Sequence, residues 1–272
     1  MPEWPPYVST HPLQCSGGEF SRAQRDVPEE VPIAVTYDGS TYAIMMGTPS
    51  DLQDFAIGFS LTEEVIGRPA DIESLEILYL DDGIEARMWL KPEASKRQRT
   101  RRRSIVGPTG CGLCGAESIA QALKPVRTLR SSLTVKPSDL VNVMGLLESR
   151  QSLNARTHAV HAAGLYTGGR IIVREDAGRH NALDKVIGAA VSTGMPAQEG
   201  IILLTSRVSV ELVQKAAWLG APIIAAVSAP TALAVRLAKS AGITLAAILR
   251  GESFEIFTHP ERITEEVPAD VA

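Results

Sequence analysis

Two cysteines in a glycine-rich segment are the residues of this sequence best suited to chemistry. Residues 110–115 read Gly-Cys-Gly-Leu-Cys-Gly, so Cys111 and Cys114 have glycine on either side and little bulk covers their thiols. A short helix is predicted from Glu117 to Leu123, and the positive end of its dipole would stabilise a thiolate just before it. An accessible thiolate is the nucleophile of sulfur chemistry.

Three chemistries use two cysteines at this spacing. A structural zinc site needs four ligands, and the only other cysteine, Cys15, lies in a predicted tail, so we predict no metal site. A thiol–disulfide oxidoreductase usually carries its pair after a strand of a βαβ unit, which is not predicted here. A sulfur carrier accepts a persulfide sulfur on one thiolate and passes it on. Two buried cysteines that only fill space are the least favoured interpretation.

A basic run lies just before the cysteines. Residues 96–103 read KRQRTRRR and contain six basic side chains. With the glycines and proline that follow, they predict an irregular loop over residues 96–116. Such a run is commonly a solvated loop, but next to reactive thiols it favours binding of an anion, either a phosphorylated cofactor or an acidic partner surface.

A second cluster of charged residues occupies residues 174–185, Arg-Glu-Asp-Ala-Gly-Arg-His-Asn-Ala-Leu-Asp-Lys. It falls where a predicted hairpin ends and a helix begins. One interpretation is a capped, salt-bridged junction. The other is that Arg179 and His180 line the same pocket as the thiols, and His161 is equally consistent with a core histidine or a pocket donor.

The elements that position these residues divide into two regions. Residues 1–27 lack periodicity and predict a disordered tail. Residues 28–95 predict a small α+β domain of two hairpins and one helix, with hairpin turns at Asp38-Gly39 and Asp82-Gly83 and the helix starting after Ser50.

Residues 117–265 predict a three-layer α/β domain, followed by a tail at 266–272. A hairpin turns at residues 167–169, and three continuously apolar strands then alternate with helices of about 11 residues, a pattern typical of βαβ units and a parallel sheet. Ligands of such sheets bind at the carboxyl ends of the strands. The three carboxyl ends correspond to residues 205–209, 228–231 and 249–253. Two of these segments lead into the N-terminus of a helix, which favours binding of a phosphate group, so we expect a phosphate-bearing ligand.

Composition narrows the class of protein. The 272 residues carry 27 basic and 31 acidic side chains, a formal net charge of −4, which is not that of a dedicated nucleic-acid-binding protein. The sequence has no apolar run near the roughly 20 residues of a membrane helix and no signal-peptide pattern. With three cysteines and no export signal, we expect reduced thiols in a cytoplasmic, non-membrane protein.

These motifs together resemble the FdhD/NarQ family of formate dehydrogenase accessory sulfurtransferases. The resemblance runs from residue 29 to residue 263 and rests on TGCGLCGAE, REDAGRHNALDKVIGAA, SRVSVELVQKAA, VSAPTALAVRLAKSAGITL and FTHPERI. The family's C-terminal half is similar in fold to cytidine deaminases. Cys111 and Cys114 precede His161 in the chain, and no H-x-E motif occurs there, so deaminase chemistry is excluded.

The resemblance implies a function. A cysteine desulfurase loads sulfur onto Cys111 as a persulfide, Cys114 assists, and the sulfur goes to the molybdenum (or tungsten) bis-molybdopterin guanine dinucleotide cofactor that serves formate dehydrogenase. The protein is expected to form a homodimer. Two other functions stay open: a chaperone that binds or inserts the cofactor without moving sulfur, and a thiol–disulfide oxidoreductase.

The same resemblance assigns a cofactor-binding segment to the end of the last predicted strand. In this sequence the segment consists of Ile248, Leu249, Arg250, Gly251, Glu252 and Ser253. Glu252 and Ser253 stand where the family commonly has glycine and arginine. By position, Arg179, His180, Ser206 and Arg207 are further candidates to hold phosphate or guanine groups.

Overall fold

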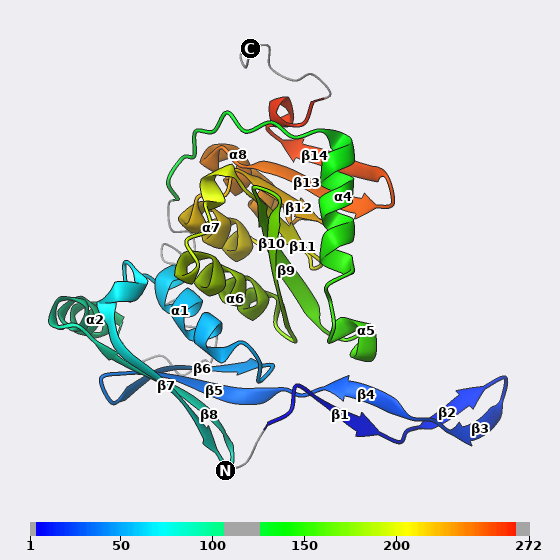
Figure 1. Cartoon of the computed structure of the whole chain (residues 1–272), viewed down its shortest axis with the longest axis horizontal. Helices are drawn as coiled ribbons and strands as arrows, with labels where there is room; N and C mark the ends of the chain where they lie inside the picture. The colour runs from blue at the N-terminus through cyan, green and yellow to red at the C-terminus, as the bar shows by residue number, and fades with distance from the viewer. Residues whose placement is uncertain (1–3, 106–125, 265–272) are drawn as a thin grey trace.

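The computed structural model describes residues 4–105 and 126–264, with side chains placed in those ranges except at 99–105. The chain forms an N-terminal ribbon, a four-stranded N-terminal sheet and a six-stranded C-terminal sheet (Figure 1). One continuous apolar core extends from the N-terminal sheet to one face of the C-terminal sheet.

The ribbon corrects one prediction. Residues expected to be a disordered tail form two successive antiparallel pairs. The inner pair is β1 (Tyr7–Thr10) with β4 (Arg25–Pro28), and the outer pair is β2 (Leu13–Ser16) with β3 (Glu19–Arg22). Figure 1 shows the ribbon projecting well beyond the two sheets. The prediction failed because strands exposed on both faces have no run of apolar residues to mark them.

The N-terminal sheet has the strand order β6-β5-β8-β7. Both predicted hairpins are confirmed: β5 (Val31–Tyr37) pairs with β6 (Ser40–Gly47), and β7 (Ile72–Leu80) with β8 (Gly83–Leu90). The hairpins are joined side by side through the parallel pairing of β5 with β8. Helix α1 (Leu52–Thr62) follows β6 and covers one face of this sheet.

Helix α2 (Pro92–Ile105) corrects a second prediction. The basic run was expected to belong to an irregular loop over 96–116, but the part of it that the structure describes is helical. Proline is favoured in the first turn of a helix, and arginine, lysine and glutamine are good helix formers. The glycines and proline that suggested a loop begin only at Gly107, beyond the end of α2.

The C-terminal sheet has the order β10-β9-β11-β12-β13-β14. The three predicted parallel strands are confirmed as β11, β12 and β13, and the predicted hairpin as β9 with β10. The hairpin joins the sheet antiparallel to β11, and β14, which was not predicted, lies antiparallel to β13. The sheet is therefore mixed. Its strands are β9 (His161–Thr167), β10 (Arg170–Asp176), β11 (Ile201–Leu204), β12 (Ile223–Ala226), β13 (Thr244–Arg250) and β14 (Ser253–Thr258).

Helices cover both faces of this sheet and make three layers (Figure 1). Helix α4 (Pro137–Glu148) packs on one face, where Leu203 and Ala225 point, and short α5 (Asn154–Thr157) follows it. The neighbouring positions Ile202 and Ile224 point to the opposite face, which alternation along a strand requires. That face is covered by α6 (Arg179–Ser192), α7 (Val210–Leu219) and α8 (Ala232–Ala241).

Two glycines let α1 and α6 approach very closely. A Cβ atom added to Gly58 of α1 would lie 1.8 Å from the carbonyl oxygen of Asp184, and one added to Gly188 of α6 would lie 1.9 Å from that of Asp54. Each glycine thus faces the backbone of the other helix. This crossing joins the two sheets into one packed body.

Two features are missing from the part of the chain that the structure describes. Within residues 4–105 and 126–264, no helix is long and apolar enough to cross a membrane. The same residues contain no group of three or more His, Cys, Asp or Glu side chains that could hold a metal ion.

Candidate functional site

The predicted reactive pair, Cys111 and Cys114, lies outside the described residues, as does the helix predicted from Glu117 to Leu123. The described part of the candidate site is the charged cluster at residues 174–185 together with the ends of the neighbouring strands.

A buried ion pair lies at the centre of the charged cluster. The Nζ of Lys185 is 2.7 Å from Oδ2 of Asp176, and neither side chain is accessible to solvent. Lys185 also donates to the carbonyl oxygens of Thr48 and Glu175, at 3.0 and 3.3 Å. Every hydrogen of this ammonium group has an oxygen partner, as a buried charge requires.

The partner carboxylate is equally well satisfied. Asp176 accepts hydrogen bonds from the backbone N–H groups of Thr48 and Gly178, at 3.1 and 2.7 Å, and from the Asn181 amide at 3.1 Å. Asn181 donates as well to the carbonyl oxygen of Met46, at 2.8 Å. The cluster therefore ties the connection between β6 and α1 to the start of α6.

Two further acidic residues of the cluster also have structural partners. Glu175 accepts from the backbone N–H groups of Leu153 and Asn154, at 2.8 and 2.7 Å, at the start of α5. Asp184 accepts from Lys215 of α7, with Nζ 2.7 Å from Oδ1. The junction interpretation of the motif is confirmed for these residues.

Arg174 takes part in the same junction. Its guanidinium pairs with Asp54 of α1, Nη2 to Oδ2 at 2.7 Å, and lies 3.3 Å from Asp51. Arg179 and His180 are thus the charged residues of the motif that the junction does not use.

Arg179 and His180 are the first two residues of α6 and face the start of α7. The Nε2 of His180 lies 2.7 Å from Oε2 of Glu211 and 3.3 Å from the Ser209 hydroxyl. The hydrogen bond from His180 lowers the pKa of Glu211. Nothing in the sequence pairs Glu211 with His180, because the contact depends on how two helices are placed. The Nε of Arg179 is buried and has no hydrogen-bond partner among the described residues.

His161 lies in the same electrostatic environment. Burial lowers its pKa, and the nearby guanidinium groups of Arg179 and Arg207 lower it further. Its ring is therefore neutral near pH 7 and can donate from one nitrogen and accept at the other. His161 opens β9, which runs antiparallel to β11, so it lies beside the carboxyl end of β11. This position supports the interpretation of His161 as a hydrogen-bond donor to a ligand.

The ends of the three parallel strands are linked to one another. After β11, Val208 donates its N–H to the carbonyl oxygen of Ala229 at 3.2 Å, and Thr231 donates to that of Val208 at 3.0 Å. The N–H of Ile248 near the end of β13 lies 3.4 Å from the carbonyl oxygen of Ser228. Buried Ser206 donates its hydroxyl to the carbonyl oxygen of Arg207, so this hydroxyl has a local structural role.

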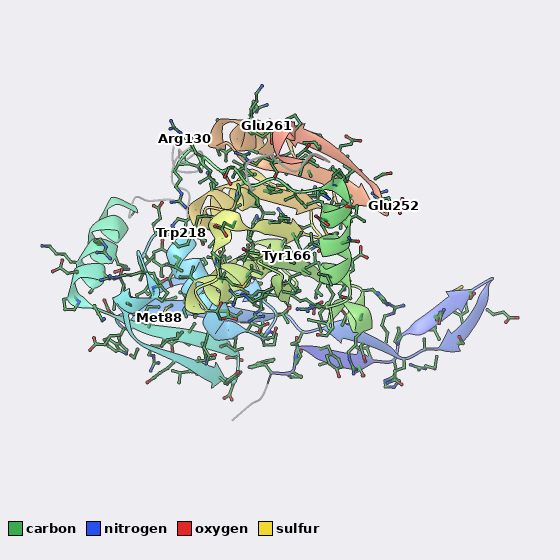
Figure 2. The ribbon with its side chains drawn as sticks, turned by 45° about the horizontal axis from the view of Figure 1, so that its top comes forward. Met88, Arg130, Tyr166, Trp218, Glu252 and Glu261 are labelled. Carbon is green, nitrogen blue, oxygen red and sulfur yellow. The ribbon has the colours of Figure 1, made fainter. Side chains whose placement is uncertain are left out.

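The segment 248–253 has unusual backbone geometry. Ile248 has φ +57°, in the left-handed region that β-branched residues rarely adopt, and the β13–β14 pairing is irregular there. Arg250 pairs with Ser253 across the turn, where Gly251 has φ +58°. Figure 2 shows Glu252 at the outer end of this hairpin. Non-glycine residues held in this conformation cluster at functional sites.

Together these residues can bind an anion. The positive charges of Arg179 and Arg207 both lower the pKa of His161, so both guanidinium groups lie near its ring. Arg179 also belongs to the first turn of α6, where the free N–H groups and the helix dipole favour a negative charge. Among the predicted site residues, the structure therefore brings Arg179, His180 and Arg207 together around His161. It connects segment 248–253 to them through the residues around Ser228.

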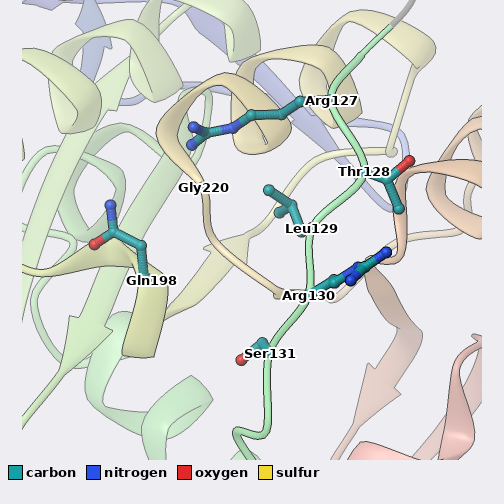
Figure 3. Close-up of a pocket in the computed structure, with 7 residues that line it drawn as sticks. All are labelled: Arg127, Thr128, Leu129, Arg130, Ser131, Gln198 and Gly220. Carbon is teal, nitrogen blue, oxygen red and sulfur yellow. The ribbon is translucent and has the colours of Figure 1, made fainter.

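A shallow cavity of about 200 Å³ lies away from this site, near the amino ends of the parallel strands (Figure 3). It is lined by Arg127, Thr128, Leu129, Arg130, Ser131, Gln198 and Gly220. Arg127 donates to the carbonyl oxygens of Ala217 and Trp218, at 3.1 and 3.2 Å, which are free at the end of α7. We interpret this cavity as a consequence of helix capping.

Comparison with known proteins gives one consistent result. The chain is 51% identical over 249 residues to the "Sulfur carrier protein FdhD" of Agrobacterium fabrum, covering 90% of this chain and 92% of that protein. It is 52% identical over 258 residues to the protein of the same name from Brucella abortus, covering 94% and 96%.

A solved structure agrees. The crystal structure of a protein described as a formate dehydrogenase accessory protein, from Desulfotalea psychrophila, superimposes with a TM-score of 0.76 at 26% identity. The match covers 96% of this chain and all of that one. The sequence profile of the FdhD/NarQ family matches residues 28–264. With its motifs, its fold and its relatives in agreement, this chain belongs to the FdhD/NarQ family.

Proposed function

We propose that this protein is a sulfur carrier that receives sulfur from a cysteine desulfurase on Cys111 and delivers it to the molybdenum or tungsten bis-molybdopterin guanine dinucleotide cofactor of formate dehydrogenase. The observation that carries the proposal is the anion site at the strand ends, where Arg179 has a buried, unpartnered Nε beside neutral His161 and Arg207. The family relatives named as sulfur carriers support the sulfur chemistry.

The loading step is a thiol–persulfide exchange. The Cys111 thiolate attacks the outer sulfur of the donor persulfide and forms a new S–S bond. The S–S bond of the donor breaks, and its electron pair remains on the donor cysteine, which leaves as a thiolate. Sulfur is transferred at unchanged oxidation level, so this step needs no further reagent.

Release to the cofactor requires two electrons. In our proposal, the Cys114 thiolate attacks the inner sulfur of the Cys111 persulfide and expels hydrosulfide, leaving a Cys111–Cys114 disulfide. A dithiol reductant of the thioredoxin class then regenerates the pair. This assigns Cys114 the relay role.

The cofactor is the cargo, and its phosphates are the groups that the site would hold. Arg179 and Arg207 supply two guanidinium groups, which suit phosphate oxygens. Neutral His161 can hydrogen-bond a base or phosphate without adding charge. Segment 248–253 would contribute Arg250 and Gly251, while Glu252 at the outer end of the hairpin would stay clear of the phosphates.

The test is mass spectrometry of the protein after incubation with an active cysteine desulfurase and cysteine. We expect one additional sulfur on the Cys111 peptide, removed by reductant and absent from Cys111→Ala. Cys15→Ala is the matched control, because that exposed thiol lies on the ribbon and should not affect loading. Failure to load either Cys111 or Cys114 would contradict the carrier function and favour a cofactor-binding chaperone.

A further inference from the structure

Helix α2 concentrates positive charge on an otherwise acidic chain. Residues 92–105 carry six basic side chains and one acidic one, a net charge of +5, whereas the whole chain has a formal net charge of −4. The residues outside α2 therefore have a net charge of −9. An anionic partner would be attracted to α2 and repelled by the net charge of the rest, so this helix would orient its approach.

The first turns of α2 are held firmly on the N-terminal sheet. Ala94 and Gln98, one helical turn apart, are buried, and α2 packs against β8. The Ser95 hydroxyl donates to the carboxylate of Asp38, in the turn between β5 and β6. The basic run therefore starts on a fixed platform, which keeps its charge at a defined place on the surface.

The outer side of α2 presents basic groups to solvent. Lys96 and Arg97 are both exposed, with 57% of the Arg97 side chain accessible. Asp71 joins Arg97 to a second exposed arginine, Arg68: its carboxylate lies 2.8 Å from Nη2 of Arg97 and 3.4 Å from Nε of Arg68. Each guanidinium donates one of its five N–H groups to Asp71, which orients both arginines and leaves further donors for a partner.

The cysteine pair is joined to this helix by a short stretch of chain. Ile105 ends α2, and Cys111 follows six residues later, so the two cannot be more than about 20 Å apart. A protein that brings a persulfide to Cys111 must therefore place its active site within that distance of the end of α2. Since a globular protein of about 300 residues has a radius of gyration of about 19 Å, such a donor is wide enough to contact the helix.

The anion site at the strand ends lies apart from α2. Figure 1 shows α2 at the outer edge of the molecule, with α1 between it and the β9–β10 hairpin. At the strand ends, Arg179 and Arg207 already supply positive charge beside His161. The charge of α2 is therefore available for a different anion.

We propose that α2 is the docking surface for the protein that donates sulfur, and that the donor surface which meets it is acidic. This inference rests on the carrier function proposed above and adds to it the place where the donor binds. The basic run could attract either a phosphorylated cofactor or an acidic protein surface, and the position of α2 favours the protein. Docking there brings the donor persulfide within reach of Cys111 and leaves the strand ends free for the cargo.

Loading kinetics with two different sulfur donors test the proposal. For the triple variant Lys96→Gln, Arg97→Gln and Arg99→Gln, we expect the KM of an active cysteine desulfurase for this protein to rise roughly tenfold or more, with little change in kcat. Loading of Cys111 by cysteine persulfide, a small donor that needs no docking surface, should be unchanged. The matched control removes the same charge from exposed positions after residue 125 and should load normally from both donors: Arg130→Gln, Arg236→Gln and Lys239→Gln.

The other outcomes of this experiment would each overturn the proposal. Equal losses with both donors would mean that the charge of α2 acts on the Cys111 thiol itself. Normal loading with a loss of formate dehydrogenase activation would assign α2 to the cargo. If neither donor loads the unmodified protein, the carrier function fails as well, and this result is distinct from a failure of docking alone.

Carbodiimide cross-linking of the protein with the desulfurase provides the second measurement. This reagent joins a lysine amine to a carboxylate that pairs with it, so we expect cross-links from Lys91 or Lys96, both exposed, to Asp or Glu of the desulfurase. Lys91→Arg with Lys96→Arg keeps the charge but forms no such amide, so this variant should lose the cross-links and load at the normal rate. Cross-links confined to other exposed lysines, such as Lys136 and Lys239, would contradict docking on α2.

Discussion

Lys185 and Asp176 form an ion pair of 2.7 Å between side chains that are both inaccessible to solvent. Lys185 is in α6, Asp176 ends β10, and both bond to Thr48 in the connection between β6 and α1. A pair so placed holds three segments together and leaves Arg179 and His180, at the start of α6, outside the junction.

Replacing Lys185 by methionine should strongly destabilise the fold. The substitution leaves the Asp176 carboxylate buried without its counter-charge, which typically costs about 3–5 kcal/mol. Urea unfolding followed by circular dichroism measures the loss. Arg97→Met, which removes an exposed pair with Asp71, is the control and should change the free energy of unfolding by about 0–1 kcal/mol. Equal effects of the two variants would contradict this assignment.

Gly58→Ala should destabilise the crossing of α1 and α6. Its Cβ would meet the backbone of Asp184, and backbone cannot move aside as a side chain can, so we expect a loss of about 1–3 kcal/mol. Gly145→Ala in α4 is the matched control, since no atom lies within 4 Å of the added Cβ. There the better helix propensity of alanine should raise stability by up to about 1 kcal/mol. A stable Gly58→Ala variant would show that the helices are not in close contact.

The free energy of unfolding should decrease as the pH falls below neutrality, because His161 becomes protonated. Burial and then the charges of Arg179 and Arg207 lower its folded-state pKa below the unfolded value of about 6.5. The unfolded chain therefore binds the proton more readily, and stability is lost as the pH falls from about 6.5 to the lower folded-state pKa. NMR titration of the imidazole gives this pKa, and His161→Gln should flatten the stability profile in the same window. A ring that titrates at or above 6.5 would contradict the prediction.

A bound anion should reverse the lowering of the His161 pKa. Inorganic phosphate held by Arg179 and Arg207 would offset their charge, so the pKa of His161 should rise when phosphate is added. The same titration in chloride at equal ionic strength is the control. An identical pKa in both buffers would mean that the site does not hold phosphate.

Arg179→Gln should separate loading from delivery. Because Arg179 is assigned to the cargo and not to the thiols, we expect normal sulfur loading on Cys111 and at least a tenfold loss in activation of formate dehydrogenase. Arg130→Gln, near the opposite end of the strands, should change neither. Impaired loading in Arg179→Gln would place this residue with the sulfur donor instead.

Local signals in the sequence predicted much of the fold. Asp38-Gly39 and Asp82-Gly83 marked both N-terminal hairpins because a two-residue turn needs particular residue types. The apolar strands and the helices between them were also recognisable. Strand β14 was missed although Phe254 and Ile256 alternate with polar residues, the pattern of a half-covered edge strand.

The site was harder to predict, because it depends on the order of strands. The charge of Arg207 acts on His161 because β9 lies antiparallel beside β11, a pairing that no local pattern specifies. The charged motif at 174–185 allowed two interpretations, a junction or a pocket, and the structure places Asp176 and Lys185 in the junction while Arg179 and His180 take no part in it. The sequence alone could not distinguish junction residues from ligand-binding residues, because the same charged residue types serve both roles.

The contact of Gly58 with Gly188 has a consequence for how this protein unfolds. Since α1 comes from the N-terminal half of the chain and α6 from the C-terminal half, neither sheet keeps its covering helix layer complete without the other. The protein should melt in a single cooperative transition, and a fragment containing only residues 126–264 should not fold independently. The two halves are therefore one folding unit, joined where two helices have no side chains between them.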